Sequence, residues 1–117
     1  MPITKRKPVS VGEMLVEEFM IPHALTQDKL AAAMGVSRKT VNELCGNKRS
    51  ITADTALLLS IVFNNTPEFW LNLQQRSDLW SALNTPARAN KIKKAVPLDV
   101  LIKKNARDVK RDRNRLT

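Results

Sequence analysis

Five polar side chains between positions 38 and 43 carry groups that could read base edges in double-stranded DNA. Arginine and lysine can donate to guanine O6 and N7, and a glutamate can accept from cytosine N4. A threonine and an asparagine nearby could reach bases or the adjacent backbone. We therefore predict that base contacts come from Arg38, Lys39, Thr40, Asn42 and Glu43.

A second group of residues is expected to contact phosphates, which supply binding strength but little sequence information. Two of its members lie at the starts of predicted helices, and three form a polar turn after the second of those helices. This predicted phosphate set is Gln27, Ser37, Asn47, Lys48 and Arg49.

These residues need two short helices to position them, and residues 26–49 predict such a pair. Thr26 and Ser37 are good N-caps, and Gly35 lies where the chain must turn between the helices. The apolar positions recur at helical spacing, which predicts a buried side on each helix. Together these features favour a DNA-binding helix-turn-helix over the alternative, a plain helical hairpin with a solvated charged face. The apolar positions are Leu30, Ala31, Met34, Val36, Val41 and Leu44.

The rest of the sequence predicts a compact all-α domain of five short helices over residues 10–85. Ser10 and Glu13 form a capping box that opens the first helix, and Pro22 ends it. The segment from Thr52 to about Phe63 is apolar on nearly all sides, which predicts the core helix of the domain. A last helix begins at 66–68, and Pro86 lies just beyond its end.

The positive charge is concentrated at the C-terminal end of the chain. The net charge is +9 over 117 residues, yet residues 1–87 contribute only +1 and residues 88–117 contribute +8. We expect a flexible basic arm at 1–9 and a basic, partly disordered extension at 86–117, with a short helix near Leu98 to Lys104.

The last helix of the domain also predicts a homodimer. One helix-turn-helix covers only a few base pairs, so repressors of this kind pair two copies over two half-sites. This helix has more large apolar side chains than closing a small core requires, and we expect some inside and some on a self-complementary surface. The predicted dimer residues are Phe69, Trp70, Leu73, Trp80 and Leu83.

Other functional classes find little support in the sequence. With one histidine, no Cys/His cluster and no glycine-rich phosphate loop, we expect neither an enzyme with catalytic residues nor a metal site or cofactor. The N-terminus lacks a secretory pattern, and no run of about 18 apolar residues predicts a membrane span. Cys45 is the only cysteine, so we expect a reducing, cytoplasmic location and a packing role for this thiol.

Four segments resemble the HigA antitoxins, also called the VapI type, within the phage-repressor-like (XRE) helix-turn-helix group. They are SVGEMLVEEF, LTQDKLAAAMGVSRKTVNEL, ITADTALLL and NTPEFWLNLQ, and the resemblance covers about Val9 to Leu83. It implies a five-helix repressor-like fold, a dimer, repression of the shared operon through operator DNA, and neutralisation of a HigB-type mRNA interferase of the RelE-like class. It also carries the DNA-contacting role onto Gln27, Ser37, Arg38, Lys39, Thr40 and Asn42.

Two departures from the family pattern and two alternatives stay open. The family often has His-Pro-Gly-Glu where this chain has Ser10–Glu13, and the cap survives that change. The basic extension exceeds that of many members, so the resemblance does not imply its role. One alternative function is a stand-alone phage-type repressor without a toxin partner. The other is an RNA-associated protein that acts through residues 88–117.

Overall fold

The computed structural model describes residues 6–103, and all regular structure within that range is helical. The chain divides into two units, Met1–Ser81 and Ala82–Thr117, and each is treated by itself below. The predicted all-α class is confirmed. Residues 1–5 of the predicted arm at 1–9, and residues 104–117 of the predicted extension, lie outside the described residues.

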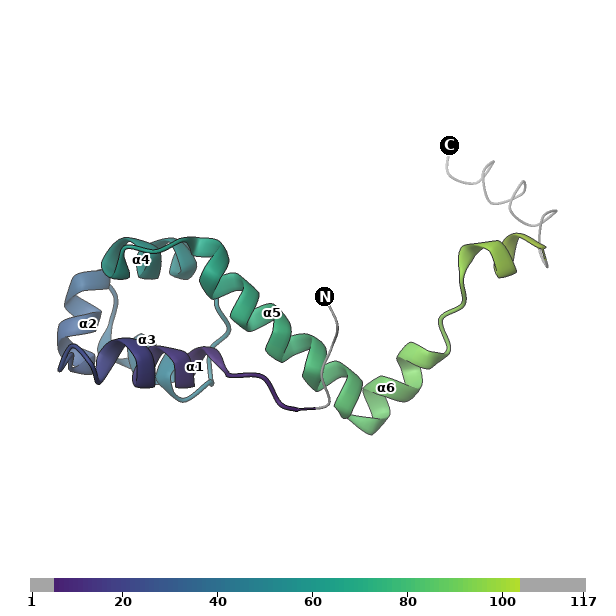
Figure 1. The fold of residues 1–117 in the computed structure, drawn as a ribbon, viewed down its shortest axis with the longest axis horizontal. Helices are drawn as coiled ribbons and strands as arrows, with labels where there is room; N and C mark the ends of the chain where they lie inside the picture. The colour runs from purple at the N-terminus through teal and green to yellow at the C-terminus, as the bar shows by residue number, and fades with distance from the viewer. Residues whose placement is uncertain (1–5, 104–117) are drawn as a thin grey trace. The chain divides into compact units, whose positions relative to one another are not determined.

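The first unit carries the predicted helix-turn-helix among short helices (Figure 1). Its elements are α1 (Val11–Met14), the π-helix η1 (Leu15–Met20), α2 (Gln27–Met34), α3 (Arg38–Cys45), α4 (Ala53–Phe63) and most of α5 (Pro67–Asn84). Four predicted helix starts are confirmed, because the hydroxyls of Thr26, Ser37, Thr52 and Thr66 each accept a backbone N–H at 3.2 Å from the residue three positions later.

The predicted count of five helices is not confirmed, since the described residues form seven named elements. The first predicted helix divides into α1 and η1, where the backbone N–H of Ile21 reaches back five residues to the carbonyl of Val16 at 2.9 Å. In the second unit, Pro86 begins a further helix, α6 (Pro86–Lys93), because a proline is well suited to the first position of a helix. Residues 98–103 are also helical, where a short helix was predicted.

The core of the first unit gathers side chains from all of its helices. Trp70 lies at its centre, fully buried, and its indole Nε1 donates to Oδ1 of Asn65 at 2.9 Å. Phe19, Phe63 and Phe69 surround this ring, with centroids 5.0, 5.9 and 5.1 Å from it. This aromatic cluster joins η1, α4 and α5, so it fixes the frame against which α2 and α3 pack.

Two of the five predicted dimer residues lie in the core, in keeping with the expected division of these side chains between core and surface. Trp70 and Leu73 are buried inside the unit, at 0% and 4% exposure, so they have no surface to offer a second copy. Phe69 and Trp80 are half-buried, and Leu83 is 44% exposed. Leu79, which was not predicted, is also 44% exposed on α5.

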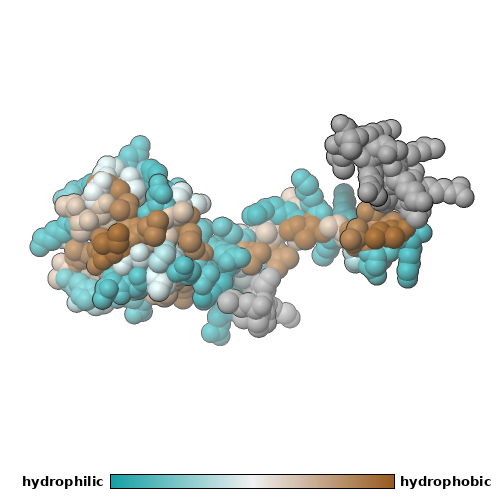
Figure 2. Space-filling model, turned by 90° about the horizontal axis from the view of Figure 1, so that it is seen from above, coloured by the Kyte–Doolittle hydropathy of each residue, from teal (hydrophilic) through white to brown (hydrophobic). Residues whose placement is uncertain are grey.

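The predicted core helix, α4, is buried on one side only. Ala56 and Leu59 are buried, but Leu57 and Ile61 are 50% and 76% exposed. Figure 2, which views the molecule from above, shows apolar side chains gathered in a band on the face of the first unit that carries α4. Leu57 and Ile61 are four positions apart, so they share one side of α4, and that side is turned to solvent. No helix among residues 6–103 is long and apolar enough to cross a membrane.

Candidate nucleic-acid interface

The exposed side of α3 carries most of the predicted base-reading residues. Val41 and Leu44 are buried in the core at 0% and 1% exposure. At 3.6 residues per turn, Lys39 and Asn42 lie on the opposite side and Arg38 lies on its flank, and the structure leaves all three exposed. Their side chains therefore point away from the domain, as contact with a base edge requires.

The remaining two predicted base contacts are less accessible. Thr40 is half-buried, and its hydroxyl lies 3.0 Å from the hydroxyl of Ser37, which caps the helix. Glu43 is also half-buried, and its Oε1 accepts from Nη2 of Arg49 at 3.3 Å. Both residues lie at the edges of the exposed side of α3, so their base contacts stay predictions that require these partners to rearrange.

Helix α2 holds α3 at a fixed angle. Gly35 ends α2 with φ +72°, a conformation that glycine adopts without strain. Leu30, Ala31 and Met34 are buried on the inner side of α2, as predicted. The tight turn and the small side chain of Ala31 allow the two helices to cross closely, which gives the exposed side of α3 one orientation.

Two side-chain contacts link the first turn of α2 directly to the exposed side of α3. Gln27 Oε1 accepts from Nδ2 of Asn42 at 3.3 Å, which leaves the amide nitrogen of Gln27 available to a phosphate. Asp28 Oδ2 pairs with Nη1 of Arg38 at 3.4 Å. The motifs in the sequence did not single out Asp28, although its place in the first turn of a predicted helix can be read from the sequence.

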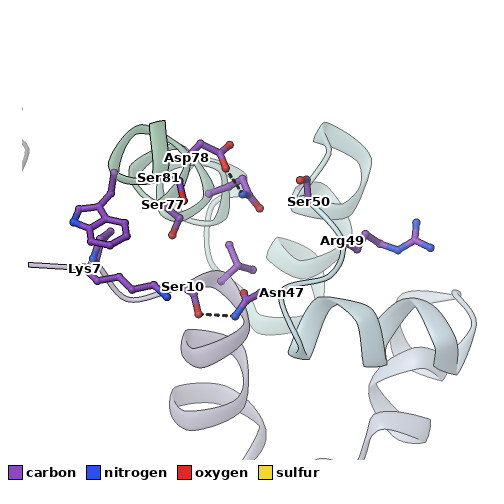
Figure 3. Close-up of a pocket in the computed structure, with 12 residues that line it drawn as sticks. Lys7, Ser10, Asn47, Arg49, Ser50, Ser77, Asp78 and Ser81 are labelled. Carbon is purple, nitrogen blue, oxygen red and sulfur yellow. Dashed lines mark hydrogen bonds between the residues drawn. The ribbon is translucent and has the colours of Figure 1, made fainter. Parts of the chain in front are cut away.

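The turn after α3 has a structural role as well as a predicted phosphate role. Asn47 Nδ2 donates to the hydroxyl of Ser10 at 2.9 Å, and Asn47 Oδ1 accepts the backbone N–H of Gly12 at 2.8 Å. Figure 3 shows the Asn47 side chain turned toward Ser10 in this way. The predicted phosphate contact of Asn47 is therefore restricted to the second hydrogen of its amide, whereas Lys48 and Arg49 are exposed.

Gly12 was also missed, and its importance lies in close packing. A Cβ at this position would overlap the carbonyl oxygen of Cys45 and lie 2.9 Å from Oδ1 of Asn47. The start of α1 therefore lies against the end of α3 at a distance that only glycine permits. This contact positions the C-terminal end of α3, whereas α2 contacts its N-terminal end.

Cys45 ends α3 in the packing role that was predicted for it. Its Sγ donates to Sδ of Met20 at 3.6 Å, and burial raises the pKa of its thiol. A raised pKa keeps the thiol protonated near neutral pH, so the side chain behaves as a small apolar group.

A pocket of about 220 Å³ opens beside this turn, within the first unit. Figure 3 shows its lining side chains, which come from the N-terminal segment, the turn after α3, and α5. It is smaller than the sites that usually enclose a small molecule, which begin at about 300 Å³. Among residues 6–103, no group of three or more His, Cys, Asp or Glu side chains is placed to hold a metal ion.

Comparison with known proteins places this geometry in a family. The helix-turn-helix family model (HTH_3) matches residues 16–71, which include α2 and α3. The chain is 48% identical over 104 residues to antitoxin HigA-1 of Vibrio cholerae serotype O1, covering 89% of this chain and 96% of the relative. It is 51% identical over 75 residues to a Haemophilus influenzae protein described as an uncharacterized HTH-type transcriptional regulator, covering 64% and 70%.

A solved structure of a relative includes DNA. The Pseudomonas aeruginosa antitoxin HigA with the higBA promoter matches with a TM-score of 0.70 and 35% identity, covering 78% of this chain and 98% of that one.

Proposed function

Because this chain belongs to the HigA family of helix-turn-helix antitoxins, we propose that it represses its own operon through operator DNA and neutralises a toxin encoded there. The observation that supports the DNA-binding part most directly is the exposed side of α3. Arg38, Lys39 and Asn42 lie on it, and contacts from α2 and α1 hold the helix in place.

Base contacts come from Arg38, Lys39 and Asn42, with Thr40 and Glu43 at the edges of the reading surface. Phosphate contacts come from Gln27, Ser37, Lys48 and Arg49, with a weaker contribution from Asn47. The relative solved with its promoter supports DNA binding by this domain, because that antitoxin matches 78% of this chain.

The active form in this proposal is a homodimer. Two copies place their α3 helices in successive major grooves, about 34–36 Å apart along the duplex. The exposed apolar residues of α5, Leu79 and Leu83, supply the dimer interface, together with the half-buried Phe69 and Trp80 of the same helix.

The toxin in this proposal is a HigB-type mRNA interferase. Support for it comes from the family, since 96% of the Vibrio cholerae antitoxin aligns with this chain. A stand-alone repressor without a toxin is the second candidate, and the Haemophilus influenzae relative, described only as a transcriptional regulator, favours it.

Footprinting of the region upstream of the gene, with and without the co-expressed neighbouring reading frame, tests both parts. An antitoxin protects a palindromic site and co-purifies with a small RNase-like partner. Protection without any co-purifying partner supports the stand-alone repressor. Absence of protection by the purified chain contradicts operator binding, and with it both candidates.

A further inference from the structure

Asp28 places a negative charge on the surface that would meet the phosphates of DNA. It is the second residue of α2, beside Gln27, and its side chain is 69% exposed. A carboxylate that is left unpaired in that position weakens binding, because the phosphates of DNA repel anions. An acid at another position of the first turn would stabilise the start of α2 equally well. The position of Asp28 therefore matters for the contact that its side chain makes.

That contact is with Arg38 at the start of α3. Asp28 Oδ2 lies 3.4 Å from Nη1 of Arg38, whose side chain is 67% exposed. As an exposed ion pair it adds little to stability. Its geometric effect is larger, because a guanidinium has five N–H donors and this contact uses one of its edges. The other donors remain free to bind guanine O6 and N7 together.

We propose that Asp28 is a specificity-determining residue that positions Arg38 for a base edge and opposes binding to DNA that lacks the matching base. The proposal rests on the operator-binding function above. If Arg38 swings to a phosphate, Asp28 is left unpaired near that same phosphate, so the contact is disfavoured. If Arg38 binds a guanine edge, which carries no net charge, the ion pair survives.

The chain provides a matched control in Asp54. Thr26-Gln27-Asp28 begins α2 and Thr52-Ala53-Asp54 begins α4, so each acid follows a threonine N-cap by two residues. Asp54 is exposed, like Asp28. Asp28→Asn and Asp54→Asn therefore remove the same charge from equivalent helix positions, but only the first lies against Arg38.

The test measures dissociation constants by fluorescence anisotropy for the upstream duplex and for a shuffled duplex of equal length and composition. Asp28→Asn is expected to strengthen binding to the shuffled duplex by about threefold to tenfold, near the effect of one counterion at 0.1 M salt, and to change operator binding by less than about twofold. Asp54→Asn is expected to change the dissociation constants of both duplexes by the same factor. Asp28→Glu is expected to retain the wild-type preference for the upstream duplex over the shuffled one.

A double-mutant cycle shows whether Asp28 acts through Arg38. In an Arg38→Ala background, Asp28→Asn is expected to leave the operator preference unchanged. Equal effects of Asp28→Asn on both duplexes, or an undiminished effect in the Arg38→Ala background, would overturn the proposal while leaving operator binding intact. A wild-type chain that shows no preference for its upstream duplex would instead contradict the proposed function, and this inference with it. Melting temperatures of all variants verify that each is folded.

Discussion

The backbone N–H of Gly12 donates to the side-chain Oδ1 of Asn47 across 2.8 Å, although 35 positions separate the two residues. Asn47 has φ +57°, a conformation that asparagine tolerates better than most residues. The same side chain also donates to Ser10. The turn after α3 therefore satisfies a backbone N–H in the first turn of α1, beside the N-cap Ser10.

Replacing Gly12 by alanine is expected to destabilise the domain by about 1–3 kcal/mol, because overpacking forces backbone to move. The new Cβ meets the backbone of Cys45, which cannot rotate away as a side chain could. Urea denaturation monitored by tryptophan fluorescence measures the loss. Gly46→Ala is the control, since its nearest atoms lie at 3.5 and 3.9 Å. Equal stability of the two variants would contradict the close-packing account.

Arg38→Ala is expected to weaken operator binding by about 1–3 kcal/mol and to relax the preference at one base pair. The reason is that its free guanidinium donors are placed on the exposed side of α3. Binding to a set of operators substituted at single positions measures this effect. An equal loss on every sequence would mean that Arg38 contacts phosphate only.

Lys48→Ala is expected to weaken binding to all duplexes alike, because this exposed side chain lies in the turn beyond the reading helix. Removing one phosphate contact should also lower the slope of log K against log salt by about one unit. A titration from low to high salt on operator and shuffled DNA measures both quantities. An unchanged slope would remove Lys48 from the phosphate contacts.

Leu83→Glu is expected to weaken dimerisation by at least about tenfold, or about 1.4 kcal/mol, by placing a charge in an apolar seam. Analytical ultracentrifugation over a concentration series measures the dissociation constant. Ile61→Glu, at a 76% exposed position on α4, is the control and should leave the dimer intact. A dimer weakened by Ile61→Glu and not by Leu83→Glu would place the dimer interface on α4.

Cys45 predicts a dependence of stability on alkaline pH. Burial raises its pKa in the folded state above the ordinary value of 9.0, so the unfolded chain loses this proton first as pH rises. The stability that depends on the protonated thiol is therefore complete below the ordinary value and falls as pH rises through the folded pKa. Comparing the wild-type and Cys45→Ala unfolding free energies across this range isolates the effect. Parallel curves would show that the thiol does not contribute.

Local chemistry made much of the fold predictable. Thr26, Ser37, Thr52 and Thr66 cap helices through contacts with residues three positions away, so the sequence in a short window determines them. Gly35 is predictable for the same reason, because a left-handed helix end favours glycine.

Long-range packing explains what could not be predicted. Trp70 and Leu83 look alike in an amphipathic pattern, and only the cluster with Phe19 and Phe63 shows which of them is inside. The ion pair of Asp28 with Arg38 depends on the crossing of two helices, and no spacing in the sequence reports that angle.

The π-helical segment η1 has a consequence for how the chain can change in length. A π turn holds more residues than an α turn, so residues 15–20 contain more residues than an α-helix of the same length would need. Deleting one residue there would let the segment revert to α geometry while its two ends keep their places. We expect single-residue gaps in alignments of relatives to occur mainly at this segment. We expect none in the turn between α2 and α3, because that turn has no extra residue to lose.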